Sequence, residues 1–363
     1  MPASFEIQSA SGRCDVSIGN GVVADLLAQP GDQIYLVDAF VAASFVGTAI
    51  DPIVIVADEP AKSLDRMPAI IEAIKARGAT RGTTLVAIGG GVVQDIATFV
   101  ASVYMRGITW LYAPTTLLSM TDSCIGGKSS VNVGKYKNIV GTFHPPLRIL
   151  IDLDFVQSLS AEQRVAGLCE AAKICFCRGP ATFEQYLALA PSVTADEATF
   201  GAVVELSLRS KKWFVEIDEF DRRERLILNF GHTFGHAIET ASDYAIGHGI
   251  AVGLGMLAAL DLGVRTGGSR HNAVVAAFRR YIVDLLGHID NLADAVERLP
   301  IADLLDAFRS DKKHSRENFA VITVNADGLV ERLTLPRNGG SDAMIAASFA
   351  SIQSALFPRS VAA

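Results

Sequence analysis

The sequence predicts an α/β Rossmann-like domain at the N-terminus followed by an all-α domain at the C-terminus. Up to about residue 155, short β-rich runs alternate with stretches of helical spacing, a pattern typical of βαβ units around a mostly parallel sheet. Beyond Asp154 the hydrophobic period is close to 3.6 almost throughout. We therefore expect two domains, residues 1–155 and 156–363, a number that suits a chain of 363 residues.

The individual strands and helices are predicted from the residues that bound them and from the period of their hydrophobic residues. Candidate strands, each bounded by Gly, Pro, Asp or Thr, are 33–38, 53–57, 84–88, 109–112 and 148–151, and helices are expected at 63–77 and 92–104. In the second domain helices are expected near 160–178, 195–218, 229–243, 248–265, 270–286, 291–299, 301–310 and 342–356. Ser160 and Gln163 have the spacing of a capping box at the start of the first of these helices. A hairpin around 319–335 is the expected exception to the helical pattern.

Composition excludes several classes of protein. The net charge is −7, with Lys and Arg scattered, which argues against nucleic acid or an anionic membrane surface as the main partner. The longest apolar stretch, 249–264, is shorter than the roughly 20 residues of a membrane span and contains Asp261. The N-terminus lacks the pattern of a signal peptide, and the five cysteines include no CxxC pair. These features predict a cytoplasmic protein with reduced thiols.

A glycine-rich turn follows the expected strand at 84–88. Gly89-Gly90-Gly91 at a strand-to-helix junction would let the backbone approach a phosphate, and the helix N-terminus would favour its negative charge. The segment does not match G-x-G-x-x-G, so a tight structural turn explains it about as well as a nucleotide site. Asp38, at the end of an earlier strand, could accept a hydrogen bond from a ribose hydroxyl or could cap a helix.

Histidines cluster in the second domain. His232 and His236 are four residues apart and share one helix face, and His248 follows closely. Glu170 is the best candidate for a further ligand, because an acid within an apolar helix is costly to bury unless it is paired or bound to metal. Two imidazoles and one carboxylate with an open position are typical of a catalytic zinc site. The alternative is a salt bridge between Glu170 and Lys173.

Two basic groups stand out against the acidic chain. Residues 122–138 contain three Lys and one Asp, a local charge of +2 in Gly- and Ser-rich sequence, and could cradle a phosphorylated substrate or form a solvated loop. A second group consists of Lys211, Lys212, Arg222, Arg223 and Arg225. Taken alone, this second group is more typical of a solvated face.

These motifs, in this order, resemble the sugar phosphate cyclases, and most closely the 3-dehydroquinate synthase family. The most specific blocks are GGGVVQD, YMRG, PTTLLSMTDSCIGGKSSVN, KNIVG, CEAAK and LNFGHTFGHAIE. The resemblance runs from the stretch beginning at Asp58 to the Asp311-Lys312-Lys313 block. It implies a dehydroquinate synthase-like fold, a homodimer, NAD bound by the first domain, and zinc or cobalt and substrate bound by the helical domain.

The resemblance also assigns residues to these roles. The implied metal ligands are Glu170, His232 and His248, in agreement with the choice made from the residues themselves. Implied NAD contacts are Asp38, Glu59, Lys62, Gly90, Gly91, Asp95, Thr115, Thr116 and Lys137. Implied substrate contacts are Arg106, which would reach across from the partner subunit, Asp122, which is also implied to contact NAD, Lys128, Asn138, and one of Lys312 and Lys313, between which the sequence does not decide. Implied catalytic residues are Lys173, Lys211, Arg225, Asn229 and His236.

The implied activity is a phosphate-eliminating lyase reaction of the shikimate pathway, which leads to the aromatic amino acids. NAD and metal would support the cyclisation of 3-deoxy-arabino-heptulosonate 7-phosphate to 3-dehydroquinate. Arg225 with Lys211 could bind the substrate carboxylate. The chain departs from the usual family pattern at Gln94, Tyr136 and Ile250.

Those departures leave other functions open. A specialised cyclase of secondary metabolism would act on sedoheptulose 7-phosphate, an amino-heptulosonate phosphate or glucose 6-phosphate. A metal-dependent polyol dehydrogenase is a further alternative, although a neutral polyol has no need of a phosphate-binding residue such as Lys128. In every case the expected partner is a small molecule.

Overall fold

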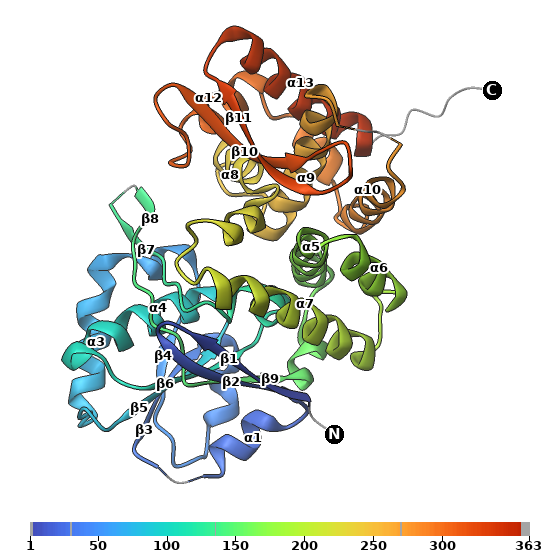
Figure 1. The fold of residues 1–363 in the computed structure, drawn as a ribbon. Helices are drawn as coiled ribbons and strands as arrows, with labels where there is room; N and C mark the ends of the chain where they lie inside the picture. The colour runs from blue at the N-terminus through green and yellow to red at the C-terminus, as the bar shows by residue number, and fades with distance from the viewer. Residues whose placement is uncertain (1–2, 30, 135, 269–270, 357–363) are drawn as a thin grey trace. The chain divides into compact units, whose positions relative to one another are not determined.

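The computed structural model describes residues 3–29, 31–134, 136–268 and 271–356, which form two compact units (Figure 1). The first unit runs to Leu159 and also contains Asp196–Arg222. The second unit contains Ser160–Ala195 and the chain from Arg223 onward. The α/β and helical parts expected from the sequence are both present. The functional division at residues 155 and 156 stays a prediction, since compactness alone assigns no function.

A seven-stranded sheet forms the centre of the first unit. Its order is β1-β2-β9-β6-β5-β3-β4; β1 and β2 form an antiparallel hairpin and the other neighbours are parallel. The strands are β1 (Ala3–Ser9), β2 (Gly12–Gly19), β3 (Gln33–Asp38), β4 (Ile53–Ile55), β5 (Thr84–Gly89), β6 (Trp110–Pro114) and β9 (Arg148–Asp152). All five strands expected from the sequence are confirmed, and the β1–β2 hairpin is an addition.

The helices of the first unit lie between and after these strands. They are α1 (Val22–Leu27), α2 (Ala39–Ala42), α3 (Met67–Ala76), α4 (Gly91–Val103) and α7 (Glu197–Ile217), with short 3-10 turns η1 (Ala43–Phe45), η2 (Glu59–Lys62), η3 (Leu64–Arg66), η4 (Tyr104–Arg106) and η6 (Leu153–Ser158). A π-turn, η5 (Ser119–Ser123), precedes a small hairpin of β7 (Val131–Val133) and β8 (Tyr136–Val140). Val23 and Leu26 of α1 and Val41 of α2 pack into one core with Val37 and Val86 of the sheet. Burial of these apolar side chains holds the layers together.

The strand register brings the carboxyl ends of three strands to one edge of the sheet. Strands β3 and β6 flank β5, and the pairs Val37 with Ile88 and Gly89 with Pro114 align their carboxyl ends. Residues that follow these three strands therefore gather at the same edge. In parallel α/β sheets this is the edge where ligands bind.

The second unit is helical except for one hairpin. Its helices are α5 (Ala161–Arg178), α6 (Pro180–Ala188), α8 (His232–Ala241), α9 (His248–Arg265), α10 (Ala273–Leu286), α11 (Leu292–Glu297), α12 (Ile301–Arg309) and α13 (Gly339–Leu356), with the 3-10 turn η7 (Glu224–Asn229). The hairpin consists of β10 (Asn318–Val324) and β11 (Val330–Pro336), as expected. The capping box is also confirmed: the Ser160 hydroxyl accepts from the backbone N–H of Gln163, whose side chain accepts from the Ser160 N–H. Helix α6 was not expected from the sequence.

Helices α8 and α9 touch through glycines. A Cβ on Gly255 would lie 2.1 Å from the Gly231 carbonyl oxygen, and one on Gly235 would lie 3.0 Å from the Ala251 carbonyl oxygen. Larger residues would force the backbones apart. His232 is the first residue of α8 and His248 is the first residue of α9, so this close contact fixes the positions of the two histidines relative to each other.

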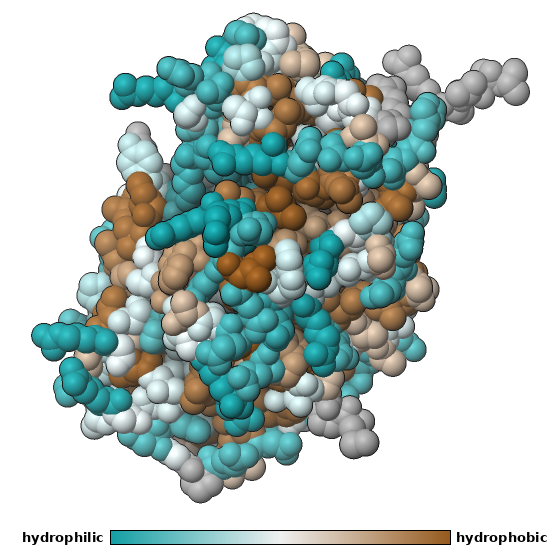
Figure 2. All heavy atoms as spheres, in the orientation of Figure 1, coloured by the Kyte–Doolittle hydropathy of each residue, from teal (hydrophilic) through white to brown (hydrophobic). Residues whose placement is uncertain are grey.

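Helix α9 is apolar along most of its length. Among the described residues it alone is long and apolar enough to cross a membrane by length and composition, yet 78% of it is buried inside the protein. It packs against α5, α8, α10, α13 and β10, as a core helix does. Figure 2 shows hydrophilic side chains spread over the drawn face, interrupted by smaller hydrophobic areas.

Candidate active site

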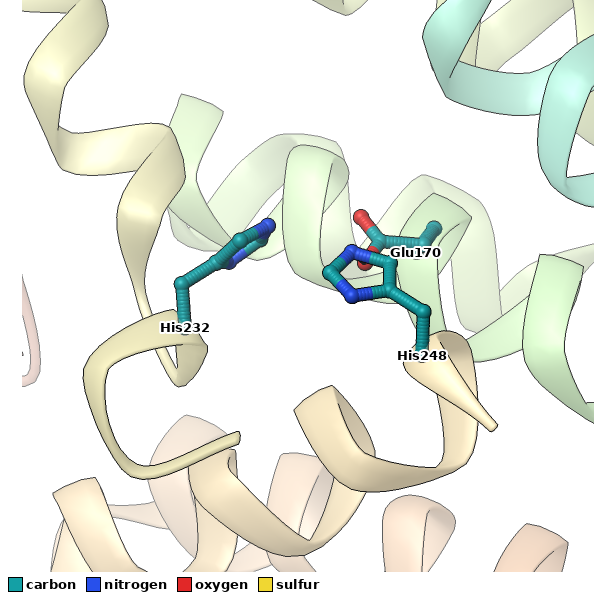
Figure 3. A group of neighbouring side chains, drawn as sticks. All are labelled: Glu170, His232 and His248. Carbon is teal, nitrogen blue, oxygen red and sulfur yellow. Dashed lines mark ion pairs between the residues drawn. The ribbon is translucent and has the colours of Figure 1, made fainter. Parts of the chain in front are cut away.

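Glu170, His232 and His248 come together in the second unit although they lie on three different helices (Figure 3). One ligand atom from each lies within 4.8 Å of the other two, so a single ion could bind all three. The Glu170 side chain is fully buried, a position that suits a carboxylate with a cationic partner. Two imidazoles, one carboxylate and further open positions fit a divalent ion of the zinc type.

The salt bridge considered as an alternative is also present. The Lys173 ammonium contacts Oε2 of Glu170. Oε1 of the same carboxylate faces the His248 Nε2 at 3.9 Å. Because the two oxygens face different groups, the ion pair and a metal-ligand role for Glu170 are compatible.

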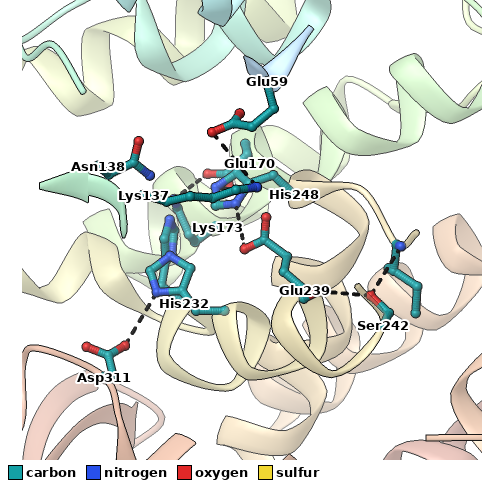
Figure 4. Close-up of polar contacts among 12 residues, drawn as sticks. Glu59, Lys137, Asn138, Glu170, Lys173, His232, Glu239, Ser242, His248 and Asp311 are labelled. Atoms are coloured by element: carbon teal, nitrogen blue, oxygen red, sulfur yellow. Dashed lines mark hydrogen bonds and ion pairs between the residues drawn. The ribbon is translucent and has the colours of Figure 1, made fainter. Parts of the chain in front are cut away.

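Glu239 is a site residue that the sequence patterns did not single out. Its Oε2 lies 3.2 Å from Nδ1 of His248, on the opposite side of the ring from Glu170 (Figure 4). Burial lowers the pKa of His248, but the hydrogen bond to Glu239 and its charge outweigh burial, and the net pKa is raised. A carboxylate in this position fixes the ring so that Nε2 points toward a metal. The available signal was its place at the end of the GHAIE motif, three residues after His236.

The other two imidazoles have lowered pKa values. Burial is the largest cause at His232, and the charge of Lys173 adds to it. Burial also lowers the pKa of His236, against the hydrogen bond to Asp311 at 3.4 Å. Neutral imidazoles are the form that binds metal and accepts protons.

Asp311 connects His236 to the Asp-Lys-Lys block. Burial raises the Asp311 pKa, yet the hydrogen bond with His236 and the charge of Lys313 outweigh it and the net pKa is lowered. Lys313 Nζ lies 3.9 Å from Asp311, whereas Lys312 is exposed. The arrangement favours Lys313 over Lys312 as the lysine that faces the histidines.

In the first unit, Asp95 on α4 is the centre of a polar network. Its Oδ2 lies 2.8 Å from Lys62 Nζ, and its Oδ1 accepts the backbone N–H of Ser130 at 2.9 Å. Lys62 also donates to Oδ1 of Asn138 at 3.1 Å. Burial raises the pKa of Asp95, while Lys62 opposes the shift. The network thus joins three of the residues predicted to bind NAD or substrate.

The remaining predicted NAD residues lie around this network and the sheet edge. Asp38 caps α2 by accepting the Phe40 N–H at 3.0 Å, which is the structural role considered as the alternative. A Cβ at Gly90 would lie 3.0 Å from Thr116 Cγ2, so a larger residue would require Thr116 to shift slightly. The others are Glu59, 3.9 Å from Lys137 Nζ, Gly91 at the start of α4, and Thr115, whose N–H donates to the Gly89 carbonyl.

Two lysines of the first unit are held by aspartates. Lys211 Nζ, nearly buried, lies 2.5 Å from Oδ1 of Asp122. Lys128 Nζ lies 2.5 Å from Oδ2 of Asp221, and the Lys128 side chain is 41% exposed. Asp221 was missed because nothing in its sequence spacing indicates this pair. A phosphate could compete with Asp221 for the exposed ammonium.

The other predicted residues lie outside the networks described above. Arg225 is buried and Asn229 donates to the Leu226 carbonyl, both within η7 of the second unit. Arg106 is exposed and has φ 69°. In the second basic group, the prediction of a solvated face is wrong for Lys211 and Arg225, which are buried, while Lys212, 29% exposed, pairs with Glu216.

Comparison with known proteins identifies the family. Residues 52–166 match the family 3-dehydroquinate synthase N-terminal, and residues 167–314 match 3-dehydroquinate synthase C-terminal. The chain is 32% identical over 352 residues to the 3-dehydroquinate synthase of Thermobifida fusca, covering 93% of both chains. It is 38% identical over 272 residues to that of Xanthomonas oryzae pv. oryzae, covering 73% of this chain and 72% of the relative.

Solved structures show the same fold. A 2-deoxy-scyllo-inosose synthase complexed with carbaglucose-6-phosphate, NAD+ and Co2+ superposes with a TM-score of 0.79 at 22% identity, over 96% of this chain and 99% of the other. ValA, a 2-epi-5-epi-valiolone synthase from Streptomyces hygroscopicus subsp. jinggangensis 5008 with NAD+ and Zn2+ bound, gives 0.76 at 23% identity, over 93% and 96%. The fold is therefore that of the sugar phosphate cyclases. Within that class, the chain belongs to the 3-dehydroquinate synthase family and is an enzyme of that family.

Proposed function

We propose that this enzyme converts 3-deoxy-arabino-heptulosonate 7-phosphate to 3-dehydroquinate, with release of phosphate and no net change in redox state. The observation that carries the proposal is the convergence of Glu170, His232 and His248, whose ligand atoms lie within 4.8 Å of one another, in a chain of this family. Phosphate elimination makes the enzyme a carbon–oxygen lyase.

The cofactors we propose are NAD and one divalent metal ion. Glu170, His232 and His248 would hold the ion, and the Asp95–Lys62 network with the edge at Gly90 and Gly91 would hold NAD. NAD supplies a reversible hydride acceptor, and the metal polarises the oxygen of the reacting hydroxyl. The donor set suits zinc or cobalt, and the two solved cyclases contain Co2+ and Zn2+ with NAD+.

The protein's own residues position the reacting groups. Glu239 orients the His248 ring, and the Lys173 ammonium holds the second oxygen of Glu170. His236, neutral and hydrogen-bonded to Asp311, is suited to accept a proton from the substrate. Asn229 supplies an amide for further hydrogen bonds to substrate.

Each unit contains cations that are suited to substrate anions. In the first unit, Lys128, released from Asp221, would bind the phosphate with Asn138. In the second unit, Lys313 is the lysine proposed to contact substrate. In the second unit, Arg225 is the cation proposed for the substrate carboxylate, because a guanidinium forms paired, charge-assisted hydrogen bonds with a carboxylate. In the first unit, Lys211 is the cation proposed for it. Asp122 would hold the Lys211 ammonium in place and accept from a substrate hydroxyl. We also propose a homodimer in which Arg106 serves the partner's substrate.

A substrate panel tests the proposal. The protein, loaded with zinc or cobalt and NAD, is incubated with 3-deoxy-arabino-heptulosonate 7-phosphate, sedoheptulose 7-phosphate and glucose 6-phosphate in turn. Phosphate release and product mass are measured for each. Release from the heptulosonate alone, with no accumulation of NADH, supports the proposal.

The same panel tests the second candidate, a specialised cyclase. Tyr136 and Ile250 stand where the family pattern differs, and Tyr136 is 58% exposed on the β7–β8 hairpin. Release from sedoheptulose 7-phosphate or glucose 6-phosphate alone would replace our proposal by this one. Steady NADH production from a simple polyol would instead indicate a dehydrogenase.

A further inference from the structure

The π-turn η5 ends in three carbonyl groups that all accept hydrogen bonds from side chains of other helices. The Thr121 carbonyl accepts from Ser207 Oγ at 2.8 Å, and the Asp122 carbonyl accepts from Lys211 Nζ at 2.7 Å, both from α7. The Ser123 carbonyl accepts from Gln94 Nε2 of α4 at 2.7 Å. The last carbonyls of a helix lack intrahelical donors, and buried ones must be satisfied elsewhere.

Gln94 makes a second bond to the same residue. The Ser123 hydroxyl donates to Gln94 Oε1 at 2.6 Å, so both polar atoms of the amide are bound to Ser123. The Gln94 residue is 4% exposed, and its backbone N–H donates to the Gly90 carbonyl in the first turn of α4. The amide therefore links the glycine-rich edge of the sheet to η5 through two well-formed hydrogen bonds.

The end of η5 is therefore hydrogen-bonded to two helices, to α7 through Ser207 and Lys211 and to α4 through Gln94. Ser123 directly follows Asp122, whose carboxylate holds Lys211.

We propose that Gln94 is a positioning residue that, through its paired hydrogen bonds to Ser123, sets the place of Asp122 and Lys211 for the sugar phosphate. The inference rests on the proposed function for its kinetic consequence, but not for its structural one. Gln94 itself is assigned no contact with substrate or metal. It acts by holding the end of η5 in a fixed position relative to α4.

Gln94→Met and Ser123→Ala test the link, with Thr98→Val as the matched control. Methionine keeps the length of the side chain but removes both hydrogen bonds, and Ser123→Ala removes the hydroxyl bond alone. Thr98 is buried on the same helix, and its hydroxyl donates to the Gln94 carbonyl at 2.8 Å, so Thr98→Val removes one buried bond without touching η5. Thermal unfolding of all three variants records the stability cost.

The kinetic readout separates positioning from stability. We expect Gln94→Met to lower kcat/KM for the sugar phosphate about tenfold, Ser123→Ala to lower it less, and the double variant to lose less than the product of the two factors. Thr98→Val should stay within about twofold while losing comparable stability. Equal kinetic losses in Gln94→Met and Thr98→Val would overturn the proposal.

A readout without turnover keeps the inference separate from the proposed function. Hydrogen exchange of the peptide spanning 119–125 should accelerate in Gln94→Met and remain as in the parent protein in Thr98→Val. If no sugar phosphate reacts with the parent protein, the proposed function fails, and exchange still decides the role of Gln94. Unchanged exchange at 119–125 in Gln94→Met would refute the link between α4 and η5.

Discussion

Replacing Glu239 by glutamine tests how the metal ligands are oriented. Glu239 Oε2 lies 3.2 Å from His248 Nδ1, and the Glu239 side chain is 15% exposed, so the carboxylate is largely screened from water. Glutamine keeps the shape of the side chain but removes the charge. Loss of a carboxylate that holds a metal-ligating imidazole typically reduces metal affinity by about 10- to 100-fold, or about 1.4–2.7 kcal/mol.

The assay is a zinc titration of the metal-free protein in competition with a chromophoric chelator at pH 8. Glu239 raises the His248 pKa, so the variant has a lower pKa and less competition from protons. The affinity loss should therefore be largest at pH 8 and shrink as the pH falls through the His248 pKa of the parent protein, which lies above 6.5.

Glu205→Gln is the matched control. Glu205 pairs with Arg209 on α7, where both side chains are substantially exposed, and its loss should leave zinc affinity unchanged. Equal zinc affinity of Glu239→Gln and the parent protein at pH 8 would refute the orienting role. An equal loss in Glu205→Gln would show that the effect is not specific to the site.

Two further predictions concern the substrate and the fold. Arg225→Ala should lower kcat/KM for the carboxylated substrate about 100-fold while leaving the inhibition constant of an analogue without the carboxylate nearly unchanged; equal losses for both would contradict the assignment. Gly231→Ala should lower the free energy of unfolding in urea by about 2–5 kcal/mol, because φ is +79° and the new Cβ would lie 2.8 Å from the Val252 carbonyl oxygen. Gly267→Ala, with φ +109° but nothing within 4 Å, should cost less, and a similar loss in both would argue against close packing at Gly231.

The sequence predicted the parts of the fold that local patterns determine. The buried runs of β3 and β5, the helix from Ser160 and the hairpin β10–β11 are found where the periodicity placed them. The β1–β2 hairpin was not predicted, because most residues of β1 are at least partly exposed and the strand contains few apolar residues. Helix α7 was expected as a helix, but the hydrophobic period of a helix does not tell which other elements it packs against. Its packing against β1 and β2 of the first unit therefore could not be predicted from the sequence.

The same distinction applies to the site. His232, His236 and His248 stand out by type and spacing, and Glu170 by its apolar surroundings, so these residues could be chosen from the sequence. Glu239, by contrast, is an ordinary helical acid until the turn between α8 and α9 brings it to His248. Asp221 and Gln94 likewise gain their importance only from contacts with residues far away in the chain.

Anomalous diffraction at the zinc absorption edge, from crystals of the zinc-loaded protein, tests the central assignment most directly. We expect one strong peak, bonded to Glu170 and to ring nitrogens of His232 and His248 at about 2.0–2.2 Å. A peak bonded to other residues, or no peak at these three side chains in crystals that contain zinc, would contradict the assignment of the metal centre and with it the proposed chemistry.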